Sequence, residues 1–190
     1  MRYFVHLVLL FALCSSQAFA NDTQVVELIV FRQSSESLPA HRVAPDNWAN
    51  GSTRLSEEQL RSTHLDHLAA KLTPEQGYQI LLHKAWLQNS DEASRHIAIS
   101  QGAAHFDHYP VEGTLTFEFD RSSVVELDLW INQFNPDNTL LSSERFKQKT
   151  IVANGQVTFV DHSTLGALIR IQAQKAPASQ AEDVNPTDFE

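Results

Sequence analysis

The feature that most constrains the fold of this chain is a change in hydrophobic periodicity near residue 78. Beyond this point apolar residues recur at every second position, most clearly where Leu115 and Phe117 share one face and Thr114 and Thr116 share the other. This is the period of a β-strand, and an apolar face opposite a polar face is typical of an antiparallel sheet. This alternation, together with short apolar or long polar stretches between turn residues, predicts strands at residues 24–31, 78–88, 95–100, 111–119, 124–131, 140–152, 156–160 and 165–171.

Some of these strands can be placed within a sheet. Residues 24–31 are apolar on both faces, which predicts a central strand. Residues 140–152 are long and polar, which predicts an edge strand. Asn154-Gly155 is the signal of a type I′ turn, so we expect a hairpin that folds 140–152 onto 156–160. Together the strands predict one mostly antiparallel sheet.

One segment has the pattern of a helix, at residues 57–72. Ser56 and Gln59 have the spacing of a capping box, and Pro74 would end the helix. Apolar side chains gather on about half of the helical wheel, at Leu60, Leu65, Leu68, Ala69 and Leu72. The predicted fold class is therefore α+β, a single domain in which a mostly antiparallel β-sheet packs on one main amphipathic helix.

A long connection precedes this helix. Residues 32–54 are rich in Ser, Pro and Asn and contain Trp48. Connections of this length without regular structure are often functional.

The first twenty residues are predicted to be a signal peptide. Arg2 supplies a positive start, residues 5–13 are apolar, and Ala18-Phe19-Ala20 predicts cleavage after Ala20. The apolar run is shorter than the about 20 residues that span a bilayer, and charged residues interrupt the later apolar runs. We therefore expect three regions: a signal peptide at 1–20, a soluble exported domain at 21–173, and a disordered acidic tail at 174–190.

The charge balance and the cysteine count exclude several function classes. Cleavage would leave 170 residues with 13 basic and 23 acidic side chains, a net charge of −10. This argues against binding nucleic acid, which requires basic side chains to displace counterions, and against a polybasic membrane-surface protein. The one cysteine, Cys14, lies in the predicted signal peptide, so the mature chain would have no thiol for catalysis or for a zinc site.

The sequence contains no motif that identifies a catalytic centre. GxSxG, SxxK and the phosphate-binding glycine loops are absent. A pair of glycosidase carboxylates needs only to converge in space, so sequence leaves that possibility open. The densest cluster of possible metal ligands is His105, Asp107 and His108, but it lacks the partner motifs of known metal sites. We therefore predict no catalytic residues, no metal and no cofactor.

A row of cations is the clearest candidate for binding. Arg145, Lys147 and Lys149 alternate along one predicted strand and so point to the same face. They could receive carboxylates of a polymer or a protein partner. Alternatively they pair across strands with Glu126 and Asp128, or protect a sheet edge, and this structural interpretation is favoured.

Other candidates also have a structural alternative. Trp130 lies on the polar face of its strand, where we expect it to be exposed and able to stack on sugar rings. His83 and Trp86 are expected in the core. Asp161 is expected to stabilise a turn rather than to form an acid–base pair with His162, because adjacent strand residues point to opposite faces.

Four segments, in this order, resemble those of one family. They are VVELIVFRQ, YQILLHKAWLQ, SERFKQK and FVDHSTLGALIRI, which span Val25 to Ile171. Together they resemble the CsiV family, periplasmic peptidoglycan-binding proteins of Gram-negative bacteria. The most specific positions are His83, Trp86, Gln88, Asp161, His162 and Gly166. Ser163 departs from the proline that the family commonly has after the histidine.

The resemblance implies a non-enzymatic protein of the periplasm that binds peptidoglycan. It would support wall synthesis by a bifunctional class A penicillin-binding protein, together with the outer-membrane lipoprotein activator of that enzyme. The resemblance transfers no binding residues, so the matching positions serve either the fold or the function. We place the binding hypothesis on Arg145, Lys147, Lys149 and Trp130. The alternatives are a metal-dependent wall hydrolase using His105, His108 and a third ligand, and a protein–protein adaptor without wall binding.

Overall fold

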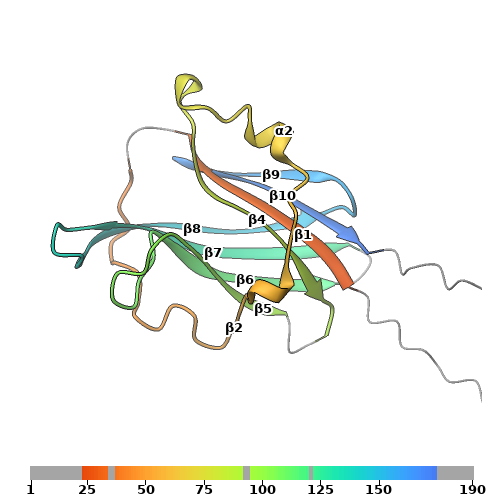
Figure 1. The fold of residues 1–190 in the computed structure, drawn as a ribbon, viewed down its shortest axis with the longest axis horizontal. Coiled ribbons are helices and arrows are strands. Elements are labelled where there is room, and N and C mark those ends of the chain that lie inside the picture. The colour runs from red at the N-terminus through yellow and green to blue at the C-terminus, as the bar shows by residue number, and fades with distance from the viewer. Residues whose placement is uncertain (1–22, 34–36, 92–94, 120–121, 175–190) are drawn as a thin grey trace, which may run out of the picture.

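Two five-stranded sheets face each other in the computed structural model, which describes residues 23–33, 37–91, 95–119 and 122–174 (Figure 1). The predicted signal peptide and the predicted tail from residue 175 onward lie outside the described residues. The strands are β1 (Thr23–Arg32), β2 (Thr53–Arg54), β3 (Leu60–Arg61), β4 (Gln79–Asn89), β5 (His96–Gln101), β6 (Val111–Phe119), β7 (Ser123–Phe134), β8 (Leu140–Val152), β9 (Val157–His162) and β10 (Leu165–Ala173).

The first sheet has the order β3-β4-β1-β10-β9 and the second has the order β2-β5-β6-β7-β8. All strand pairs are antiparallel except the short pair β2–β5. The predicted antiparallel architecture is confirmed, as are the central position of β1 and the edge position of β8. The prediction of one sheet is wrong.

The main core lies between the two sheets. Trp86 of β4 and Phe117 of β6 meet there edge to face, with ring centroids 6.4 Å apart, and both are fully buried. The alternating apolar residues of β1 and β7 also point into this layer, so the period-two pattern places one face of each sheet against the other. A buried ion pair also joins the sheets, since Arg32 of β1 lies 2.6 Å from Glu144 of β8.

The predicted hairpin at Asn154-Gly155 does not form. Gly155 has a positive φ of 74°, but Asn154 does not, so the predicted type I′ turn is wrong as well. The Gly155 N–H donates to the carbonyl oxygen of Ile171 at 2.7 Å. However, β9 pairs with β10 and β8 pairs with β7, so the turn carries the chain from one sheet to the other. The Asn-Gly pair therefore marks a turn here, but it fixes neither the type of the turn nor the strand partner. That partner is set by burial, because Val152 and Val160 both enter the core between the sheets.

The predicted main helix at 57–72 is also wrong. The segment instead forms three short elements, which are the 3₁₀ turn η2 (Glu57–Gln59), β3 and the four-residue helix α2 (Asp66–Ala69). A second 3₁₀ turn, η3 (Pro74–Gln76), begins at Pro74. The capping interaction is present, since the Ser56 N–H donates to Gln59 Oε1 at 3.1 Å. The chain nevertheless leaves the helix at Leu60, which pairs with Trp86 on β4.

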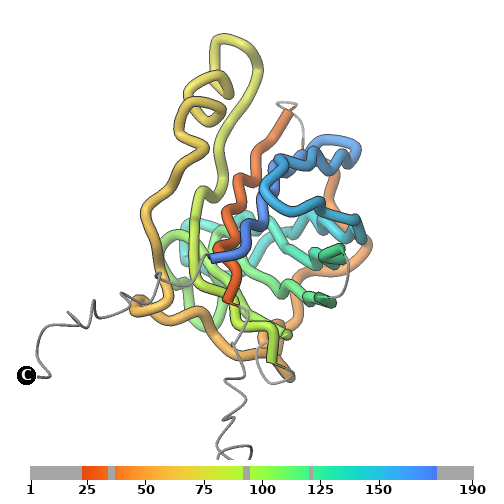
Figure 2. Tube along the Cα trace, turned by 90° about the vertical axis from the view of Figure 1, so that its right-hand side faces the viewer, coloured from red at the N-terminus to blue at the C-terminus, as the bar shows by residue number. Residues whose placement is uncertain are grey.

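Glu27 explains why this segment is irregular. Its carboxylate is buried in the first sheet, and Oε1 accepts hydrogen bonds from the backbone N–H groups of His64 and Leu65 at 2.9 and 2.8 Å. A continuous helix would use these N–H groups internally. Leu65 instead packs on Ile29 and Phe31 from outside the first sheet. Figure 2 shows the segment beside the strands, with its yellow part projecting beyond their ends.

Candidate binding site on the outer face of the second sheet

The long connection after β1 is fixed on the outer face of the second sheet. The Ala44 N–H donates to Ser143 Oγ on β8 at 2.9 Å. The indole N–H of Trp48 donates to the carbonyl oxygen of Asp107 at 3.1 Å. Residues 37–52, here called the crossing loop, are therefore held at several points on the sheet and bring their side chains over β6, β7 and β8.

A buried carboxylate holds several polar side chains in place beneath the crossing loop. Glu112 of β6 is fully buried, and its Oε1 lies 2.7 Å from His108 Nδ1 and 2.8 Å from Asn132 Nδ2. His108 Nε2 lies 3.2 Å from Asp46 Oδ1 in the crossing loop. Burial alone would lower the pKa of His108, but the carboxylates of Glu112 and Asp46 outweigh it and raise that pKa.

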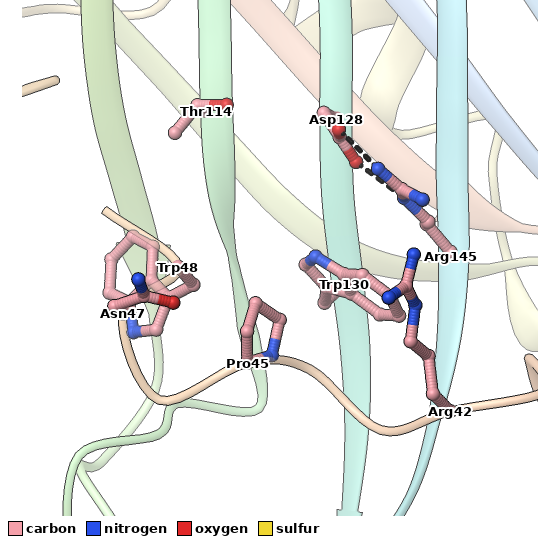
Figure 3. Close-up of a pocket in the computed structure, with 8 residues that line it drawn as sticks. All are labelled: Arg42, Pro45, Asn47, Trp48, Thr114, Asp128, Trp130 and Arg145. Atoms are coloured by element: carbon pink, nitrogen blue, oxygen red, sulfur yellow. Dashed lines mark hydrogen bonds and ion pairs between the residues drawn. The ribbon is translucent and has the colours of Figure 1, made fainter. Parts of the chain in front are cut away.

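A pocket of about 230 Å³ lies between the crossing loop and the sheet (Figure 3). The loop supplies Arg42, Pro45, Asn47 and Trp48. The strands supply Thr114 of β6, Asp128 and Trp130 of β7, and Arg145 of β8. We call it the Trp48–Trp130 pocket.

The two arginines of the pocket differ in their pairing. Arg145 donates to both carboxylate oxygens of Asp128, at 2.7 and 2.6 Å. Burial would raise the pKa of Asp128, but the hydrogen bonds and charges of Arg145 and Lys147 outweigh it and hold that pKa below its usual value. Arg42, by contrast, has no acidic side chain within ion-pair distance among the residues that the structure describes.

Arginine side chains also cover the indoles. The guanidinium carbon of Arg145 lies 4.9 Å from the ring centroid of Trp130, and that of Arg54 lies 4.7 Å from the ring centroid of Trp48. Trp130 is only 6% exposed, so the expectation of an open stacking platform is wrong. Its strand face is the predicted one, but Arg145 covers the ring and the pocket residues of the crossing loop lie over this face (Figure 3).

The predicted cation row follows β8, and its members have carboxylate partners. Lys147 Nζ lies 3.0 Å from Glu126 and 3.3 Å from Asp128. Lys149 Nζ lies 3.0 Å from Glu118, one strand further away than the expected partners. The cross-strand pairing that the sequence favoured is present for Arg145 and Lys147. Of the row, Arg145 lines the pocket, whereas Lys147 and Lys149 do not.

Three positions of the family resemblance lie on β4, and two of them are buried. His83 is only partly buried, so its expected place in the core is wrong, but its Nε2 lies 2.9 Å from Glu27 Oε1 and is satisfied within the fold, as expected. Trp86 is fully buried, and its indole N–H donates to Gln88 Oε1 at 3.2 Å. Gln88 itself is 1% exposed. These hydrogen bonds join all three side chains to other residues of the first sheet.

The other three positions lie on the hairpin of β9 and β10. Asp161 Oδ1 accepts a hydrogen bond from Gln33 at 2.7 Å, and the His162 ring packs on Phe146 with centroids 5.5 Å apart. At Gly166 a Cβ would lie 2.6 Å from the ring of Phe31, so only glycine allows this contact. These residues thus fix the hairpin against β1 and the second sheet.

The histidine cluster is used within the fold. His105 packs its ring on Phe134 at 4.4 Å between centroids, and both ring nitrogens of His108 face carboxylates. The described residues contain no group of three side chains arranged to hold a metal ion. Nor do they include a helix long and apolar enough to cross a membrane.

Sequence reasoning identified two of the eight residues that line the pocket as candidate binding residues. Trp130 and Arg145 were identified from the alternation of their strands, but Arg42 and Asn47 were missed because an irregular loop has no period that would give their direction. Two features of the sequence pointed to a functional role for this loop, namely the length of residues 32–54 and the single tryptophan within them.

The fold and the site together define a class: an antiparallel two-sheet protein in which a loop crosses the outer face of one sheet and encloses a small pocket against it. A family model described as "Peptidoglycan-binding protein, CsiV" matches residues 49–174. The chain therefore belongs to the CsiV family of peptidoglycan-binding proteins, as the resemblance predicted. The match begins after β1, so the VVELIVFRQ segment lies outside it. Searches of curated proteins and of solved structures gave no match.

Proposed function

We propose that this protein is a non-catalytic, periplasmic accessory factor that binds peptidoglycan through the Trp48–Trp130 pocket. The observation that carries the proposal is the pocket itself, in which two arginines and two indoles from separate segments meet on the outer face of the second sheet. Family membership supplies the ligand class. The proposed binding residues are Trp48, Trp130, Arg42 and Arg145.

Local contacts must provide the affinity. The chain carries a formal net charge of −9 and peptidoglycan carries carboxylates, so long-range electrostatic repulsion opposes association. The charged residues of the pocket lining are Arg42, Arg145 and Asp128, which gives a local excess of one positive charge. Lys147 and Lys149 are assigned to pairing with the acidic residues beside them rather than to the ligand.

The family resemblance extends the proposal to location and partners. Export would follow from cleavage after Ala20, and the mature protein would act with a class A penicillin-binding protein and its outer-membrane lipoprotein activator. Of the two alternatives, a metal-dependent hydrolase has little support, because His108 is already hydrogen-bonded to Glu112 and Asp46. A pure protein adaptor differs from the proposal in having no affinity for the wall.

The test is sedimentation of the purified exported form with protein-free sacculi. We expect the protein to pellet with the sacculi and to release no soluble muropeptides. Protein that stays in the supernatant would support the adaptor, and released muropeptides would support a hydrolase. Mild crosslinking in cells, followed by purification, would then show whether the penicillin-binding protein and its activator are recovered with this protein.

A further inference from the structure

We infer that the Trp48–Trp130 pocket binds a free peptide carboxylate of peptidoglycan, with the Arg42 guanidinium as its receptor. This inference rests on the proposed function and names the chemical group that the pocket takes. It differs from the sequence hypothesis, which placed the carboxylate on the row of Arg145, Lys147 and Lys149.

The pairing of the cations selects Arg42. Arg145 donates two hydrogen bonds to Asp128, and Lys147 and Lys149 each lie within 3.0 Å of a glutamate. A ligand carboxylate would have to compete with these protein carboxylates. Arg42 lacks such a competitor within the described part of the chain, and Figure 3 shows its guanidinium directed toward Trp130 and Arg145. The pocket lining thus contains two guanidinium groups and one carboxylate, so one positive charge can pair with the carboxylate of a ligand.

The size of the pocket and the burial of its indoles favour a terminal carboxylate of the peptide over a sugar as the ligand. Stacking on a sugar requires an accessible ring face, but Trp48 and Trp130 are 7% and 6% exposed and an arginine covers each ring. The volume of about 230 Å³ is below the roughly 300–1,000 Å³ of pockets that enclose drug-sized ligands. A terminal carboxylate with its adjoining residue fits this space better than a disaccharide does.

Two further polar side chains in the lining can orient such a group. The Asn47 amide and the Thr114 hydroxyl have no side-chain hydrogen-bond partner among the described residues. Both can donate to a carboxylate or to the peptide carbonyl beside it. The pocket therefore offers a charged donor and neutral donors for one anionic end.

The experiment compares two ligands and three proteins by calorimetric titration. The ligands are a soluble muropeptide with free peptide carboxylates and the same muropeptide with those carboxylates amidated. The proteins are the wild type, Arg42→Gln, and Lys149→Gln as a control that removes an exposed cation of the same sheet outside the pocket. Thermal unfolding checks that each variant is folded.

We expect the wild type to prefer the free acid by at least about tenfold, because a hydrogen-bonded charge pair would be lost on amidation. Arg42→Gln should lose this preference and Lys149→Gln should keep it. The inference is overturned if the wild type binds both ligands alike, if Arg42→Gln retains the preference, or if both variants lose it equally. Any of these results, with wild-type binding to sacculi intact, leaves the proposed function standing. Failure of the wild type to bind sacculi would overturn both.

Discussion

The imidazole of His108 bridges the sheet and the loop that together form the pocket, with Nδ1 2.7 Å from the buried Glu112 and Nε2 3.2 Å from Asp46 of the crossing loop. Both ring nitrogens face carboxylates, so the doubly protonated imidazolium donates to both while a neutral ring donates to only one. One of the contacts that hold the crossing loop on the sheet therefore depends on the charge of this histidine.

Stability should fall as pH rises through the folded-state pKa of His108. That pKa is raised above the ordinary value of 6.5, because the carboxylates outweigh the opposing effect of burial. A raised pKa contributes stability that is fully present below the unfolded value and is lost above the folded value. Urea unfolding of the wild type and His108→Gln should therefore show a difference in unfolding free energy that shrinks as pH rises from about 6 to about 9.

The control for this prediction is His96→Gln, which removes an exposed histidine of β5 whose ring forms a hydrogen bond with Thr116. A constant difference between wild type and His108→Gln across the same pH range would contradict the account of the bridge.

Replacing Glu27 with Gln should destabilise the protein and release the segment over the first sheet. The carboxylate receives two backbone N–H groups and also lies near His83 and Arg170, at 2.9 and 3.2 Å. An amide keeps the shape but loses the charge, which should cost about 2–4 kcal/mol of unfolding free energy. Hydrogen exchange should accelerate at the amides of His64 and Leu65.

Glu58→Gln is the matched control, because Glu58 is exposed in η2 and its side chain forms no described ion pair. If the two amides exchange at the wild-type rate in Glu27→Gln, the carboxylate does not hold this segment.

Gly166→Ala should destabilise the hairpin of β9 and β10. The added Cβ would lie 2.6 Å from the Phe31 ring, which stacks on Phe159 at 6.3 Å between centroids, so the rings must shift. Overpacking of this kind costs about 1–3 kcal/mol, which thermal or urea unfolding would detect. In a Phe31→Leu background the same substitution should cost less, since the crowded atoms are removed. An equal cost in both backgrounds would show that the ring contact is not the reason for glycine.

The eight longer strands were predictable because each has at least one face against the core, whereas the two-residue strands β2 and β3 were not predicted. The alternation over 111–119 and the long polar stretch at 140–152 predicted β6 and β8 with their observed ends. The pairing of the two sheets was not predictable, because an Asn-Gly turn looks the same within a sheet and between sheets. The helix at 57–72 failed for a related reason. Its local pattern was sound, but Glu27, some forty residues earlier in the chain, takes the N–H groups that a helix would need.

The site shows the same division between local pattern and tertiary contact. The SERFKQK segment drew attention through its cations, yet its buried Glu144 joins the sheets through Arg32 while two of the cations pair on the surface. Sequence placed Trp130 on the correct face of β7 but could not foresee the crossing loop that covers this face. Arg42 could be identified as a candidate receptor only when the structure showed which other cations already pair with carboxylates.

The most direct test of the central claim uses the three tryptophans of the chain as reporters. In an NMR titration of the exported form with soluble muropeptide, we expect the indole N–H signals of Trp48 and Trp130 to shift and that of Trp86, buried between the sheets, to stay unchanged. Saturating muropeptide that leaves Trp48 and Trp130 unmoved would contradict binding at this pocket.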